Sequence, residues 1–100
     1  MNVLETITIR LHDLKNEPLV KAALTHIPTD VTGAPIRIDL FRSATVENDW
    51  QVQILRPGGR TTADKSPLAV SLAETFRPIG MVHHSVLVPV PSDERPEKEN

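Results

Sequence analysis

Residues 36–55, IRIDLFRSATVENDWQVQIL, contain the pattern that decides the fold of this chain. Apolar and polar side chains alternate over residues 36–43 and again over residues 50–55, which is the period of a half-buried β-strand. The polar segment between the two runs carries Glu47, Asn48 and Asp49. Two alternating runs joined by a short polar connection predict a β-hairpin.

The segments on either side of the hairpin predict one helix and one strand each. Residues 3–12 alternate as a strand, and residues 15–27 place apolar side chains at helical spacing. Ser66 and Pro67 mark the start of a helix that runs to Phe76. Residues 81–90 alternate again and predict the last strand, with Val86, Val88 and Val90 on its core side. The order predicts an α+β, ferredoxin-like βαββαβ sandwich. Its antiparallel sheet has the first and third strands at the centre and both helices on one face.

Length and charge limit the domain organisation and the partners. A chain of 100 residues fits one domain, predicted for residues 1–91, and residues 28–35 are predicted to be a loop. The charged, Pro-containing residues 92–100 are predicted to be a disordered tail. The formal charge of -2 equals that of residues 93–100, which hold four acidic and two basic side chains, so the remainder is neutral. A neutral domain argues against nucleic acid as a partner.

Sequence features that the chain lacks limit its cellular compartment and its covalent chemistry. The chain has no cysteine, so neither a disulfide nor a thiolate nucleophile is expected. There is no apolar run long enough to cross a bilayer and no secretory signal pattern at Met1, so no membrane partner and a cytoplasmic location are expected. No metal is predicted, because His83 and His84 point to opposite faces of their strand and cannot both ligate one ion. No cofactor is predicted either.

The sheet face away from the helices is the candidate site, because it mixes Thr, Gln, Arg and His with a few apolar side chains. We expect five of its residues to converge at one end and bind a small organic, anionic or quinone-like ligand. These residues are Arg10, His12, Arg37, Gln53 and His83. The alternative is a solvated surface on which Arg37 pairs with Asp39 along the strand.

Two segments carry a family resemblance. Residues 66–76, SPLAVSLAETF, lead into residues 80–86, GMVHHSV, and this run resembles the second half of the small dimeric α/β-barrel proteins. That superfamily includes the antibiotic biosynthesis monooxygenase-like group. The resemblance implies a homodimer of two ferredoxin-like chains packed sheet against sheet. Oxygenase members tend to end the third strand with a Glu-x-Trp pattern, whereas Trp50 here stands at its beginning.

Three functional hypotheses follow. The first is a homodimeric α/β-barrel protein that binds a small organic ligand, including an anionic one, on the open sheet face. The second is a cofactor-independent monooxygenase or isomerase that acts on a phenolic or quinone substrate with a histidine as general base. The third is a dimerisation or interaction module without a ligand. The sequence does not decide whether the chain is an enzyme.

Overall fold

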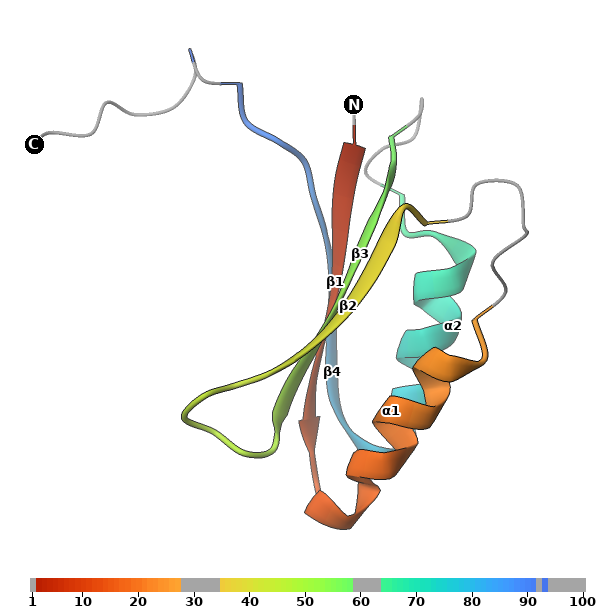
Figure 1. The fold of residues 1–100 in the computed structure, drawn as a ribbon, viewed down its shortest axis with the longest axis vertical. Coiled ribbons are helices and arrows are strands. Elements are labelled where there is room, and N and C mark those ends of the chain that lie inside the picture. The colour runs from red at the N-terminus through yellow and green to blue at the C-terminus, as the bar shows by residue number, and fades with distance from the viewer. Residues whose placement is uncertain (1, 28–34, 59–63, 92, 94–100) are drawn as a thin grey trace, which may run out of the picture.

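A computed structural model describes residues 2–27, 35–58, 64–91 and 93 of the chain. Four strands form one antiparallel sheet in the order β2-β3-β1-β4, and both helices cover the same face of it (Figure 1). This is the predicted α+β, ferredoxin-like arrangement, with β1 and β3 at the centre. The elements are β1 (Asn2–Leu11), α1 (Glu17–Thr25), β2 (Arg37–Arg42), β3 (Asp49–Pro57), α2 (Pro67–Phe76) and β4 (Gly80–Leu87). Short 3-10 turns, η1 (Leu14–Asn16) and η2 (Arg77–Ile79), precede α1 and β4.

Both helices begin at the predicted proline-containing starts. The Ser66 hydroxyl accepts a hydrogen bond from the backbone N–H of Ala69, and Pro67 occupies the first turn of α2. Such a cap satisfies one of the N–H groups that a helix start leaves without a partner. The first helix is shorter than the predicted residues 15–27, since Leu14–Asn16 form the 3-10 turn and α1 ends at Thr25.

The core lies between the sheet and the two helices. Alternate side chains of β1 and β3 point toward the helices, where they meet one apolar stripe from α2 and Val20 of α1. With a single tryptophan and one phenylalanine in it, this core is mainly aliphatic. Its buried members are Ile7, Ile9, Leu11, Val20, Trp50, Val52, Ile54, Ala69, Leu72, Ala73 and Phe76.

Gly80 starts β4 at a close approach between two backbones. It pairs with Leu11, and a Cβ atom placed on it would lie 2.5 Å from the carbonyl oxygen of Arg10. Any side chain at this position would therefore push β4 away from β1. The absence of a side chain on Gly80 allows the edge strand to join the centre of the sheet.

The prediction that the last strand extends to Val90 with Val88 and Val90 facing the core is wrong. β4 ends at Leu87, which pairs with Leu4, and both valines are half-exposed. Only Val3 and Asn2 of β1 remain beyond this point, and Pro89 has no N–H to donate to a ladder. The apolar alternation therefore continues in sequence after the sheet has ended.

No helix in the described segments is long and apolar enough to cross a membrane. The predicted loop at residues 28–35 and the predicted tail at residues 92–100 fall almost entirely outside the described residues.

Candidate functional site

The open face of the sheet, which no helix covers, is ordered in rows by the strand register. Four rows lie along it, and each row joins side chains from neighbouring strands. The rows are Asp49–Arg10–Met81, Phe41–Gln51–Thr8–His83, Asp39–Gln53–Thr6–Ser85 and Arg37–Leu55–Leu4–Leu87. One end of the face is therefore charged, the centre is polar and neutral, and the other end is apolar apart from the Arg37–Asp39 edge.

Both arginines of the open face already have partners. Arg10 forms a bidentate pair with Asp49, with nitrogen–oxygen distances of 2.6 and 2.8 Å, and Arg37 Nε lies 2.6 Å from Asp39 Oδ2. The hydrogen bond from Arg10, together with its charge, holds the pKa of the Asp49 carboxyl below its ordinary value, although desolvation acts in the opposite direction. The two positive charges that the sequence offered for an anionic ligand are thus neutralised on the same face.

The predicted convergence of five residues at one end of the sheet is wrong. Arg37 pairs with Leu55, which pairs with Leu4, so it lies in a row six residues from Arg10 along β1. Six residues of strand span about 20 Å. The reason is that β1 and β3 are antiparallel, which places the end of one beside the start of the other.

The other predicted residues are divided between the centre and the charged end. Gln53 lies in the centre of the face and donates a hydrogen bond of 2.8 Å to Gln51 Oε1. His12 follows the end of β1 and has an exposed side chain, while its backbone N–H donates to the carbonyl of Ile79. Only Arg10 and His83 share one location on the open face.

Arg10 and His83 line a shallow hollow of about 340 Å³ on the β1–β4 side of the face. Its other lining residues are Thr8, Asp49, Met81 and Val82. His83 Nε2 shares a hydrogen bond of 2.9 Å with the hydroxyl of Ser85, two residues further along the strand. A second hollow of about 270 Å³ lies toward β2 and includes Thr8 and Phe41. The face therefore offers two small concave areas around its polar centre.

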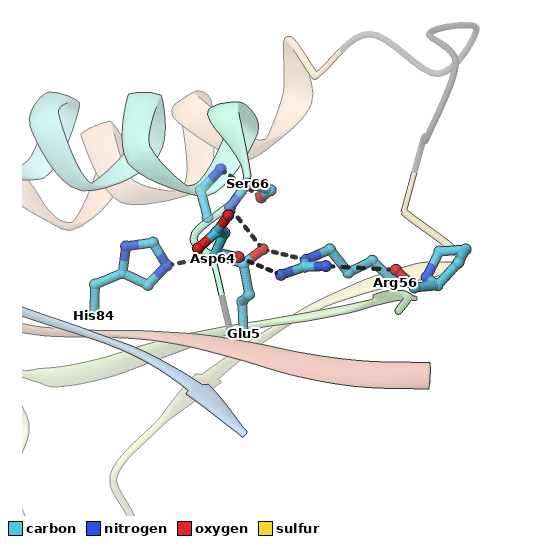
Figure 2. Close-up of polar contacts among 7 residues, drawn as sticks. Glu5, Arg56, Asp64, Ser66 and His84 are labelled. Carbon is cyan, nitrogen blue, oxygen red and sulfur yellow. Dashed lines mark hydrogen bonds and ion pairs between the residues drawn. The ribbon is translucent and has the colours of Figure 1, made fainter. Parts of the chain in front are cut away.

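A second polar cluster lies on the covered side of the sheet, where sequence reasoning identified no site. The Glu5 carboxylate is fully buried and accepts hydrogen bonds from Arg56 Nε, from His84 Nε2 at 2.7 Å and from the backbone N–H of Ser66 at 3.0 Å. Figure 2 shows these groups converging on Glu5 from β3, β4 and the start of α2. We call Glu5, Arg56, Ser66 and His84 the buried network.

The charge state of the buried network follows from its hydrogen bonds. Burial by itself raises the pKa of the Glu5 carboxyl, but the hydrogen bonds from Ser66, Arg56 and His84 together lower it further than burial raises it. Glu5 is therefore ionised and can only accept hydrogen bonds. It follows that His84 carries a proton on Nε2, because the carboxylate has none to donate.

Arg56 extends the buried network to both ends of the connection between β3 and α2. Its guanidinium donates to the carbonyl oxygen of Asp64 at 2.6 Å and to that of Pro57 at 3.4 Å. The network thus joins the sheet to the residues that lead into α2. The sequence contains a signal for this cluster, since Glu5 and Arg56 occupy core-facing positions in the alternation of their strands.

The cluster of ionisable groups does not amount to a metal centre. Among the described residues, no group of three or more His, Cys, Asp or Glu side chains is placed to hold a metal ion. Comparison of the chain with protein-family models, with curated proteins and with solved structures gives no match. The fold and the two polar regions therefore carry the functional argument without a relative.

Proposed function

We propose that the chain is a homodimer whose two open sheet faces pack against each other and enclose a small organic ligand. The supporting observation is the composition of the open face. Phe41, Met81 and Leu87 are 48%, 68% and 50% exposed on it, although they surround a polar centre in which Thr6 is already buried. Exposed apolar side chains around a partly buried centre are typical of a surface that a partner covers.

The size of the open face fits a partner of the same kind. Four strands that each occupy about 4.8 Å, and the eight intervals of about 3.3 Å between nine paired residues, give a face of roughly 19 by 26 Å. Its projected area is about 500 Å², and the accessible area of protruding side chains exceeds the projection. A standard interface buries about 800 Å² on each partner, so one sheet face is of the required order. Two sheets stacked in this way form a common two-layer core.

The charge of the open face also suits a second copy. Arg10 with Asp49 and Arg37 with Asp39 leave no net charge among the Arg and Asp side chains of this face. Two identical faces related by a two-fold axis can therefore approach without like-charge repulsion between these groups. This argument favours a copy of the chain over a strongly charged partner.

The hollow lined by Arg10 and His83 is the part of the open face assigned to the ligand. Its volume of about 340 Å³ is at the small end of ligand pockets, and a second sheet would close it. His83 and Ser85 supply a donor and an acceptor for an oxygen atom of the ligand. Because Asp49 neutralises Arg10, a hydroxyl or carbonyl compound fits this hollow better than an anion does.

The dimer is tested by the molar mass in solution. Sedimentation equilibrium of the full chain should give twice the chain mass of 11.1 kDa. Met81→Glu, which puts an additional negative charge beside the Arg10–Asp49 pair on the open face, should give the single chain mass. Val70→Glu, at an exposed position of α2, is the matched control and should remain dimeric. A wild-type chain that stays monomeric at every concentration would refute the proposal.

The ligand site is tested with phenol as the probe. In NMR spectra of the full chain, phenol should shift the ring resonances of His83, and the shift should saturate. His83→Ala should abolish phenol binding while the dimer persists. A dimer that forms without any response to phenol would support the interaction module without a ligand.

A cofactor-independent oxygenase or isomerase is the second candidate function. The observation that favours it is the hydrogen bond between His83 and Ser85, which holds an imidazole ring at the hollow as a potential general base. If this function holds, His83→Gln should abolish turnover of a phenolic or quinone substrate while its binding is retained. Unchanged turnover in that variant would remove the candidate.

A further inference from the structure

The basic residues of the described part of the chain fall into two groups. Five of them form ion pairs with acidic side chains. Three have no such pair among the described residues, and these are Lys21, Arg42 and Lys65. Two of the three, Lys21 and Arg42, lie at the same aromatic ring.

That ring belongs to Trp50, at the start of β3 on the helix-covered side of the sheet. Arg42 ends the edge strand β2 and pairs directly with Trp50, and its guanidinium carbon lies 5.6 Å from the ring centroid. Lys21 projects from α1 and places Nζ 5.9 Å from the same centroid. A helix and an edge strand thus bring two exposed cations to one indole.

Among the described residues, no acidic side chain forms an ion pair with Lys21 or Arg42, and no acceptor is hydrogen-bonded to Trp50 Nε1. Glu17 stands one helical turn before Lys21 but forms no ion pair with it. The nearest acid in sequence, Asp49, points to the open face and is taken by Arg10. Within the described residues, Trp50 Nε1 is the one buried side-chain nitrogen or oxygen without a hydrogen-bond partner. Buried donors normally have a partner, so this orphan needs an explanation.

We propose that Lys21 and Arg42 form a binding site for a small anion, a carboxylate or a phosphate group, at the edge of the Trp50 ring. A guanidinium group that lies over an aromatic ring keeps its N–H donors free around its perimeter, where they match two oxygens of a carboxylate or phosphate. The ammonium group of Lys21 adds three donors and a second charge. An anion held there offsets the mutual repulsion of the two cations.

The side chains of Lys21, Arg42 and Trp50 lie on the covered side of the sheet at the β2 edge, whereas the proposed interface is the opposite face. Arg42 and Trp50 also line the second hollow, which lies toward β2. Lys21 and Arg42 also have no acidic partner among the described residues, whereas the charges of Arg10 and Arg37 are already neutralised. An anion bound beside Trp50 on the covered side would leave the open face available for the second copy.

The tryptophan itself reports on the site. Trp50 is the single tryptophan of the chain and there is no tyrosine, so the intrinsic emission excited in the indole band comes from this residue alone. Titration of the full chain with benzoate, and separately with inorganic phosphate, should change the emission and reach saturation. Ionic strength is held constant with sodium chloride. Benzamide, which has the shape of benzoate without its charge, should produce no saturable change.

Charge-removing variants identify the residues responsible. Arg42→Gln and Lys21→Gln should each weaken benzoate binding by about tenfold or more, because each removes charge-assisted hydrogen bonds to the anion. Lys65→Gln removes an unpaired charge that does not contact the ring, so binding should be unchanged. All three positions are exposed, and circular dichroism checks that the variants are folded. Phosphate binding without benzoate binding would restrict the site to phosphate groups.

Two results would overturn the proposal. One is a wild-type emission that shows no saturable response to either anion. The other is a response of equal affinity in Arg42→Gln, Lys21→Gln and Lys65→Gln, which would show that the anions act through general screening. Neither result depends on whether the chain is a dimer, so the failure of this site is distinguishable from that of the proposed function.

Discussion

The Glu5 carboxylate makes the strongest prediction about stability. Glu5→Gln keeps the shape of the side chain but removes its charge and replaces one acceptor oxygen with an NH₂ donor. That donor would face groups that already donate, namely Arg56, His84 and the backbone N–H of Ser66. Since Glu5 is fully buried, water cannot replace the lost acceptor. The substitution would therefore leave buried donors unsatisfied and Arg56 without its carboxylate partner.

The loss in the free energy of unfolding follows from the partners that the substitution removes. Removing one partner of a buried ion pair costs about 3–5 kcal/mol. Arg56 retains the carbonyl groups of Asp64 and Pro57, so the lower end applies, about 3 kcal/mol. The total stability of a small domain is about 5–15 kcal/mol, so this is a large fraction of it. For a domain of this size, the midpoint of thermal unfolding should fall by roughly 12–24 °C.

Urea unfolding monitored by circular dichroism measures this effect directly. The midpoint should decrease while the m-value is unchanged, which identifies a change in stability. Glu74→Gln is the matched control, because Glu74 is 65% exposed and pairs with Arg77 on the surface of α2. It should cost less than about 0.5 kcal/mol. A loss below about 1 kcal/mol in Glu5→Gln would refute the reasoning that the network is a buried, charge-dependent unit.

The pH dependence of the Glu5→Gln effect has a defined sign. The pKa of Glu5 in the folded chain is below its ordinary value of 4.5, so its stabilising effect is complete above that value. It is lost as the pH falls through the lowered pKa of the folded state. The difference between wild type and Glu5→Gln should be constant above about pH 5 and shrink in more acidic solution. A difference that grows on acidification would contradict this assignment of the charge.

Three further predictions concern other parts of the fold. Gly80→Ala should destabilise the chain by about 1–3 kcal/mol in urea unfolding, because its Cβ would meet the carbonyl of Arg10. Ser66→Ala should cost about 1 kcal/mol through loss of the α2 cap, and Ser66→Gly only a few tenths. In NMR titration the Asp49 carboxyl should have a pKa below 3.8, and Arg10→Gln should raise it toward that value. An Asp49 pKa that is unaffected by this substitution would show that the pair does not form.

The periodicity of the sequence was sufficient to predict the order of the elements and the central position of β1 and β3. Period-two alternation and the Ser66–Pro67 start are local signals, and the structure confirms them. The end of β4 could not be read in this way, because it depends on where its partner strand stops. Beyond the Leu4–Leu87 pair, β1 has only Val3 and Asn2 left, and the ladder between β1 and β4 ends there although the alternation continues in the sequence.

The candidate site was predicted only in part, because the positions of its residues depend on strand direction and strand pairing. The open face does carry the predicted mixture of polar and apolar side chains, and Arg10 and His83 share a hollow on it. The error with Arg37 came from the relative direction of the strands, which moves a residue by the whole length of the sheet. The pairing of Arg10 with Asp49 and the approach of Lys21 to Trp50 depend on tertiary positions that no local pattern specifies.

The buried network lies on the covered side of the sheet, but it also affects the open face. It restricts the strand register, and the register decides which side chains the open face carries. Glu5, Arg56 and His84 come from three neighbouring strands, and each side chain must point toward the helices to make its contact. A slip of β1 by one residue would turn Glu5 to the open face and leave Arg56 without its carboxylate in a buried position. A slip in the direction that brings Ile7 and Ile9 to the positions of Thr6 and Thr8 would also make the centre of the open face apolar. An ionic cluster in the core therefore disfavours the registers in which the open face would lose its polar centre.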